Sequence, residues 1–162
     1  MTLMTSDLSD AIGFGPLPKD WYTVRAVEIQ DETSNKTQAP MLALTLMVET
    51  GEYAKKRVFP PYRVMLGGVT EKGEKQRTDR VCELINATNV EWKCNGCGAS
   101  GVRKFVKNDQ QKYLCPDCMQ VTKFSYDTDH FRDKVFRALL SQEKGFNSEE
   151  MVNSVARVAP LS

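Results

Sequence analysis

Four of the five cysteines form two C-x-x-C pairs, Cys94 with Cys97 and Cys115 with Cys118. Seventeen residues, 98–114, separate the pairs, and this spacing is typical of a structural zinc site. Each short turn lets two thiolates occupy two corners of a tetrahedron about 2.3 Å from the metal. Because four sulfur ligands leave no position for water, the spacing predicts one structural Zn²⁺ per chain without a catalytic role.

The segment that carries the four cysteines is expected to be a zinc ribbon over residues 92–130. Residues 102–106 and 111–114 flank a polar turn at 107–110, which predicts two short strands. A segment of about 40 residues buries too little apolar area to fold alone, so metal binding would supply the missing free energy. The alternative, a redox dithiol, rarely comes as two spaced pairs on a hairpin.

Two further groups of reactive side chains have simpler explanations. Cys82 lies in a segment, 78–88, whose apolar spacing predicts a short amphipathic helix with Thr78 as its cap, so Cys82 is expected in the core. Asp127, Asp129 and His130 form a D-x-D-H cluster that could bind a catalytic metal, as in a nuclease. A polar turn that leads out of the ribbon is the preferred interpretation.

The remaining chain has the pattern of a mainly β protein with one short helix. Residues 41–50 alternate apolar and polar side chains, as in an antiparallel sheet with one buried face. Pro60 and Pro61 must end a third strand or place it at an edge. Residues 134–143 suit either a strand or a helix, and residues 64–77 suit a mobile loop. Strands are thus expected at 21–29, 41–50, 53–59 and 152–158, with 134–143 as the remaining strand.

This order of three strands, a helix and two strands is that of an OB-fold antiparallel barrel. The ribbon would be inserted between the helix and the fourth strand. The predicted domains are a discontinuous barrel of residues 15–91 and 131–160, the ribbon insertion, and a flexible N-terminal segment of residues 1–14.

Short motifs in this order resemble a known family. They are Leu17-Pro-Lys-Asp-Trp21-Tyr22, Leu42-Ala-Leu-Thr-Leu-Met-Val48, Gly51-Glu-Tyr53, Arg57-Val58-Phe59, Lys134-Val-Phe136-Arg-Ala-Leu-Leu and Val152-Asn153-Ser-Val155-Ala-Arg157-Val-Ala-Pro160. Over about residues 15–90 and 133–160, the chain resembles the bacteriophage single-stranded DNA-binding proteins of the OB-fold type. The resemblance implies a phage-encoded protein that coats single-stranded DNA in replication or recombination and is not an enzyme.

A barrel that holds single strands without reading their sequence needs spaced cations and exposed rings on which bases stack. Residues 51–80 hold eight basic and four acidic side chains, whereas residues 1–50 hold three and seven. In barrels of this class the ligand lies across the second and third strands, which favours the third-strand cluster. The candidate DNA contacts are Trp21, Tyr22, Arg25, Tyr53, Lys55, Lys56, Arg57, Phe59, Tyr62 and Arg63.

Each candidate ring also suits the interior of a small barrel, and alternation allows only Lys55 and Arg57 to share a face with Phe59. The ribbon has three candidate roles, namely an extension of the DNA path through its cations, docking of a phage replication or recombination protein, and support of the fold. Because residues 81–162 hold 11 basic and 10 acidic side chains, docking or support is preferred. The ribbon cations concerned are Arg103, Lys104, Lys107 and Lys112.

Composition and motifs exclude several classes of protein. With 41% hydrophobic and 27% charged residues the chain is too apolar to be disordered, and no apolar run approaches the roughly 18 residues of a membrane span. Residues 1–10 lack a signal-peptide pattern, so the host-cell cytoplasm is expected. P-loop, H-E-x-x-H and G-x-G-x-x-G motifs are absent.

The main alternative to DNA coating is a zinc-ribbon adaptor protein. Oligomeric state and preference for DNA or RNA stay open.

Overall fold

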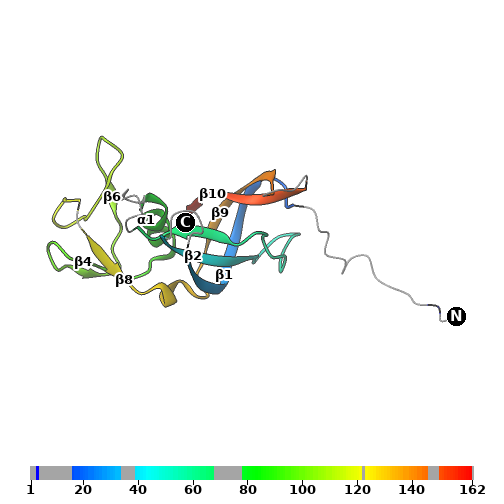
Figure 1. Ribbon diagram of the computed structural model, residues 1–162, viewed down its shortest axis with the longest axis horizontal. Helices are drawn as coiled ribbons and strands as arrows, with labels where there is room; N and C mark the ends of the chain where they lie inside the picture. Colours follow the sequence, from blue (N-terminus) through cyan, green and yellow to red (C-terminus); the bar gives the residue numbers. More distant parts are fainter. Residues whose placement is uncertain are drawn as a thin grey trace.

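The computed structural model describes residues 3, 16–33, 39–67, 78–121, 123–145 and 150–161. The segment 1–14, expected to be flexible, lies outside these residues except for Leu3, as does 68–77 of the expected loop. Figure 1 shows a curved sheet at one end, the ribbon at the other, and the single α-helix of the described residues between them. The elements are β1 (Asp20–Thr33), β2 (Pro40–Val48), β3 (Tyr62–Met65), α1 (Asp79–Thr88), β4 (Trp92–Cys94), β5 (Ser100–Gly101), β6 (Val106–Lys107), β7 (Tyr113–Leu114), β8 (Phe124–Tyr126), a 3₁₀ helix (Thr128–Phe131), β9 (Val135–Lys144) and β10 (Met151–Ala159).

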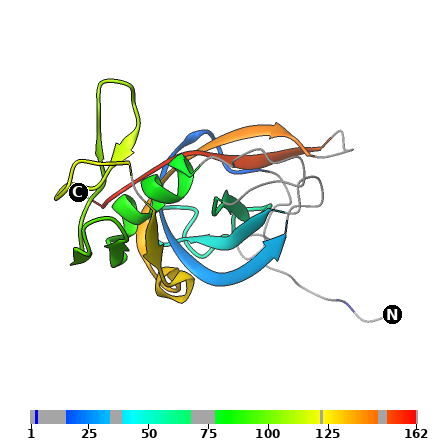
Figure 2. The ribbon, with the colours of Figure 1, turned by 60° about the vertical axis from the view of Figure 1, so that its left-hand side comes forward.

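The main sheet has the strand order β10-β9-β1-β2-β3, and all of its pairs are antiparallel. The alternation expected in β2 is present, because Leu42, Leu44 and Leu46 are completely buried on one face. A register shift between Ala26 and Glu28 marks a bulge in β1, and Figure 2 shows how strongly this strand curves. A bulge bends its strand, so β1 can pair with β9 at one end and with β2 along its length.

The sheet does not close into a barrel by strand pairing among the described residues. Its edge strands are β3 and β10, and the amide of Asn153 in β10 donates to the carbonyl of Phe59, which precedes β3, at 3.1 Å. Side chains of α1 satisfy other backbone groups of β10. The guanidinium of Arg80 donates to the Ala156 carbonyl at 2.6 Å, and the Glu83 carboxylate accepts the amide of Val158 at 2.9 Å.

The third strand differs from its expected position at residues 53–59. Residues 52–55 form a turn in which Lys55 has a left-handed φ of 72°. Backbone hydrogen bonds join Lys55 and Lys56 to Val48, and Val58 to Leu46, both on β2. Pro60 and Pro61 have no N–H to donate, so the regular strand begins only at Tyr62. The first half of the expected third strand is therefore a turn, and the regular strand β3 runs from Tyr62 to Met65, into the segment 64–77 assigned to a loop.

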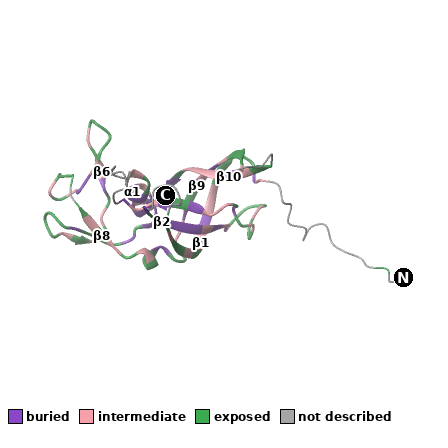
Figure 3. Ribbon diagram, in the orientation of Figure 1, coloured by how far each residue is buried: buried purple, intermediate pink, exposed green. Residues whose placement is uncertain are grey.

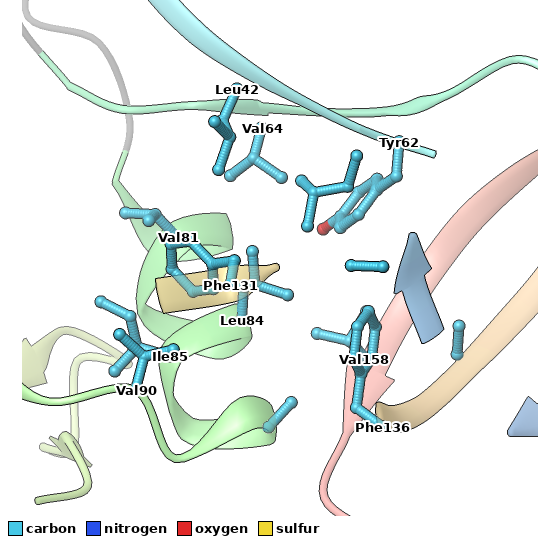
Figure 4. Packing of buried hydrophobic residues seen from close by; sticks show 14 of the residues in the cluster. Leu42, Tyr62, Val64, Val81, Leu84, Ile85, Val90, Phe131, Phe136 and Val158 are labelled. Carbon is cyan, nitrogen blue, oxygen red and sulfur yellow. The ribbon is translucent and has the colours of Figure 1, made fainter. Parts of the chain in front are cut away.

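The other expected elements are confirmed. Helix α1 buries Val81, Leu84 and Ile85 against the sheet, as Figure 4 shows, although the Thr78 side chain makes no capping hydrogen bond. The ambiguous segment after the ribbon is a strand, β9, because its alternate residues Phe136, Ala138 and Leu140 are buried. The prediction of a mainly β chain with one short helix is therefore correct.

The ribbon packs directly on α1. The Asn86 side chain donates to the carbonyl of Phe105 at 3.1 Å and accepts its amide at 2.8 Å, as a neighbouring strand would. Its strands are shorter than expected, since β5, β6 and β7 have two residues each. Figure 3 shows buried segments in the sheet, helix and ribbon, and one cluster of buried side chains joins all three. The boundaries of the two domains stay a prediction.

Candidate metal centre and nucleic-acid interface

The four paired cysteines come together at one point of the ribbon. All their Sγ atoms lie within 4.8 Å of one another, with 3.9 Å between Cys94 and Cys118 and 3.8 Å between Cys97 and Cys115. Four sulfurs about 2.3 Å from a central ion would be about 3.8 Å apart. Spacing and donor type therefore fit one metal ion held by four thiolates.

The two cysteine turns have the same backbone hydrogen bonds. The carbonyl of Cys94 accepts the amide of Gly98, and the carbonyl of Cys115 accepts that of Met119. The amides of Cys94 and Cys115 in turn donate to the carbonyls five residues further on. Gly98 and Met119 occupy equivalent positions and both are left-handed, with φ of 80° and 57°. One turn therefore has glycine at this position and the other has a residue with a side chain.

Arg103 supports the metal centre from outside. Its guanidinium donates to the Cys115 Sγ at 2.7 Å, to the Ala99 carbonyl at 3.2 Å, and to the Asp117 carboxylate. It also lies 4.2 Å from the centre of the Trp92 ring. Arg103 is one of the four cations considered for an extension of the DNA path, and it is largely buried and engaged within the ribbon. It offers a positive charge to thiolates that would otherwise repel each other.

An aromatic cluster forms the small core beneath the cysteines. The rings of Trp92 and Phe105 are stacked 3.9 Å apart, and Phe124 contacts both edge-on. The Trp92 indole N–H donates to the Arg103 carbonyl at 2.6 Å, so its polar atom is satisfied. Stacked and edge-on rings contribute about 0.5–1.5 kcal/mol per pair beyond the area they bury. Trp92 and Phe105 are 2% and 7% exposed, so these two rings serve mainly as core.

The cysteine thiols differ in their ease of ionisation. Burial disfavours the Cys115 thiolate, but backbone N–H groups of Cys118 and Asp117 and the guanidinium of Arg103 stabilise it, so its pKa lies below the ordinary value. Burial raises the pKa of Cys82 to about 12. Cys82 lies on the buried side of α1, which confirms its expected place in the core.

The D-x-D-H cluster forms a turn. The Asp127 carboxylate accepts the amide of Asp129 at 2.9 Å and thereby caps the 3₁₀ helix, and His130 lies 3.7 Å from Asp127. In the described part of the chain, the four cysteines are the only group of three or more His, Cys, Asp or Glu residues placed to hold a metal ion. The preferred interpretation as a polar turn agrees with this geometry.

Three arginines among the candidate DNA contacts lie on the sheet, and each is paired with a glutamate. Arg63 lies 2.9 Å from Glu32, and Arg57 lies 3.5 Å from Glu28. Arg25 is paired with Glu49 and also donates to the carbonyl of Asp133 at 3.1 Å. The outer face of β1, β2 and β3 therefore has compensated charge and little excess of cations.

The remaining candidate DNA contacts lie in different environments and not on one surface. Tyr62 is only 8% exposed, so its ring offers no face to a base, and burial raises its pKa to about 12. Tyr22 and Tyr53 contact each other edge-on, and Lys56 lies 5.0 Å from the centre of the Tyr53 ring.

The most exposed rings of the candidate set lie elsewhere. They are Trp21, 39% exposed beneath the guanidinium of Arg137, and Phe59, 71% exposed. Lys55 is exposed on the turn before Phe59 and has no ionic partner among the described residues. The ten residues therefore do not form one continuous surface.

The ribbon carries an excess of basic over acidic side chains. This excess is not visible when residues 81–162 are counted together. Residues 92–126 hold six basic and two acidic side chains, and Arg103 is paired with one of those acids, Asp117. The other five cations are exposed lysines, and none of them forms an ion pair with a described residue. They are Lys93, Lys104, Lys107, Lys112 and Lys123.

The described residues contain no helix that is long and apolar enough to cross a membrane. Comparison of the sequence with protein-family models finds no matching family, and a search of curated proteins finds no match.

Proposed function

We propose that the protein binds single-stranded DNA without strong sequence preference, and that it does so as a non-enzymatic protein with a structural zinc ion in its ribbon. The observation that carries the proposal is the antiparallel sheet of five strands in the order β10-β9-β1-β2-β3, with α1 between β3 and β9 in the chain. This is the order expected for an OB-fold, which commonly binds oligonucleotides. A phage origin and a role in replication or recombination rest on the family resemblance.

Zinc is the metal that best suits the four cysteines. Tetrahedral sets of four thiolates are typical of zinc or of iron–sulfur clusters, and two C-x-x-C turns on a ribbon are typical of structural zinc. Cys94 and Cys115 are buried and Cys97 is exposed, so the ion would be shielded by protein on one side. A closed set of sulfur ligands supplies folding free energy and leaves no site for substrate.

Exposed rings and unpaired cations would make the contacts to DNA. Phe59 has an exposed ring, and Lys55 lies on the turn that precedes it. A base that stacks on an aromatic ring contributes about 1–3 kcal/mol, and this contribution does not depend on the base.

Titration of the purified protein with fluorescently labelled oligonucleotides tests the proposal. We expect tight, salt-sensitive binding to single strands of different sequence and weaker binding to a duplex of equal length. Phe59→Ala should lower the affinity about 5- to 150-fold, which corresponds to one lost stack. Val102→Ala, which trims another exposed apolar side chain, is the matched control. Absence of binding, or cleavage of the oligonucleotide with Mg²⁺ or Mn²⁺, would contradict the proposal.

A second candidate function is that of an adaptor that binds another protein through the ribbon. Three apolar ribbon side chains, Val102, Met119 and Val121, are more than half exposed, which is the observation that favours it. An adaptor would bind single strands weakly or not at all, so the same titration distinguishes the two functions.

A further inference from the structure

Three hollows lie along one side of helix α1. The largest, of about 580 Å³, lies between α1, the β6–β7 hairpin and β10. A second, of about 370 Å³, shares Asp79, Gln111 and Tyr113 with the first. A third, of about 270 Å³, lies at the open edge between β3 and β10 and shares Arg80 with the first. The three neighbouring hollows follow α1 from the ribbon to the sheet edge, and together they are called the groove.

Both walls of this groove carry cations. The hairpin contributes Lys107 and Lys112, and the opposite side contributes Arg80 and Arg157. At the sheet edge, Arg63 lines the third hollow beside Pro60, which follows the exposed ring of Phe59. Tyr113, half buried, lines the first two hollows, and the Lys107 ammonium lies 5.0 Å from its ring centre.

The carboxylates around the groove cancel only part of these charges. Five cations and three carboxylates line it. Arg157 lies 3.9 Å from Glu83, and Arg63 lies 2.9 Å from Glu32 on β1. The two hairpin lysines form no ion pair with a described residue. They differ in this from Arg25 and Arg57 on the sheet, which are each paired with a glutamate.

We infer that single-stranded DNA runs in this groove, with its phosphates against the hairpin lysines and its bases reaching the Phe59 ring at the sheet edge. The inference rests on the proposed function and replaces the path expected across the outer face of β2 and β3. It gives the ribbon a direct part in binding, because the metal centre fixes the hairpin that forms one wall.

The test compares two pairs of ribbon lysines of equal charge. Lys107→Gln/Lys112→Gln removes both hairpin cations, and Lys93→Gln/Lys123→Gln removes two exposed ribbon lysines that do not line the three hollows. The affinity of each protein for a labelled oligonucleotide is measured from 50 to 400 mM salt. Each lost phosphate contact lowers the slope of log affinity against log salt by about 0.7, so the hairpin pair should lower it by about 1.4.

At about 100 mM salt the hairpin pair should bind roughly tenfold more weakly than the wild type. The Lys93/Lys123 control pair should change the slope by less than about 0.5. Metal content and far-UV circular dichroism show that each variant is folded. Equal effects of the two pairs, or no effect of the hairpin pair while the wild type binds, would overturn the groove and leave the proposed function intact. A wild type that binds no single strand would overturn both.

Discussion

The sheet and the ribbon are stabilised by different means. The sheet buries a continuous set of aliphatic side chains, including Val24, Leu44 and Leu46, and needs no ligand for this. The ribbon has strands of two or three residues, one small aromatic cluster and four cysteines around a point. Burial supplies about 25 cal/mol per Å² of apolar surface, and the ribbon has little such surface to bury. Its stability should therefore depend on the metal.

The sheet and the ribbon also differ in how their cationic side chains are paired. Arginines on the sheet are matched by glutamates from neighbouring strands, whereas the ribbon lysines have no such partners among the described residues. Exposed ion pairs contribute about 0–1 kcal/mol each, so the sheet pairs matter more for the surface potential than for stability. The part of the molecule that is expected to depend on a metal is thus also the part in which five exposed lysines lack an ion-pair partner among the described residues.

Removal of the metal should separate the two regions most clearly. Chelation, or Cys115→Ser, removes a binding free energy of about 10–16 kcal/mol and should unfold the ribbon while the sheet keeps its hydrogen-exchange protection. In a Trp21→Phe background the emission of Trp92, which is 2% exposed, should shift to longer wavelength. The comparison fails if Trp92 emission and amide protection of β6 and β7 stay unchanged.

A substitution in the core of the sheet should destabilise the sheet and leave metal binding by the ribbon unchanged. Leu44→Ala removes a completely buried side chain at the centre of the sheet and should lower the free energy of unfolding by about 2–5 kcal/mol in urea titration. One metal ion per chain should still be bound. The control is Thr45→Ala on the opposite face of β2, which should cost less than about 1 kcal/mol. Loss of the metal from folded Leu44→Ala would show that the regions are not independent.

Arg103→Gln should weaken the metal centre without removing a ligand. The change removes the hydrogen bonds to Cys115 and Asp117, so metal affinity should fall about 10- to 100-fold in competition with a chelator. Lys104→Gln, at the exposed neighbouring position, should leave metal affinity unchanged. Equal affinity in wild type and Arg103→Gln would mean that Arg103 serves only the packing of Trp92.

The stability of the two cysteine turns should depend on whether glycine occupies the left-handed position: loss of glycine should destabilise the first turn, and gain of glycine should stabilise the second. At Gly98 an added Cβ would touch nothing within 4 Å, so Gly98→Ala should cost the ribbon about 1 kcal/mol through its left-handed φ alone. Met119→Gly should stabilise the ribbon by a similar amount, and Met119→Ala should not. Amide exchange of the metal-bound ribbon measures all three, and a gain with Met119→Ala equal to that with glycine would contradict the backbone explanation.

Cysteine spacing predicted the metal centre because the ligands of each pair are close in sequence. The spacing of apolar residues, alternate in the strands and three or four apart in the helix, also predicted β2, α1 and β10 from nearby positions. Arg103 could not be recognised, since nothing in the sequence separates it from the exposed Lys104 beside it. Its role depends on how the ribbon brings it back to Cys115, 12 residues later.

The predicted DNA contacts could not be tested for ion pairing from the sequence, because their partners are distant in the chain. The glutamates that neutralise Arg57 and Arg63 lie 29 and 31 residues earlier in the chain, so only the strand register shows the pairing. Pro60 and Pro61 were expected to end the third strand or place it at an edge. The strand is at an edge, but the prolines only interrupt a pairing with β2 that continues to Met65.

Helix α1 has a consequence for how copies of this protein behave in concentrated solution. An uncovered outer strand offers unpaired amides and carbonyls to any neighbouring chain, which is a common beginning of uncontrolled self-association. Here the side chains of Arg80 and Glu83 already occupy such groups on β10. A second molecule could add a strand there only by displacing the helix, so α1 also keeps that edge of the sheet closed to other copies.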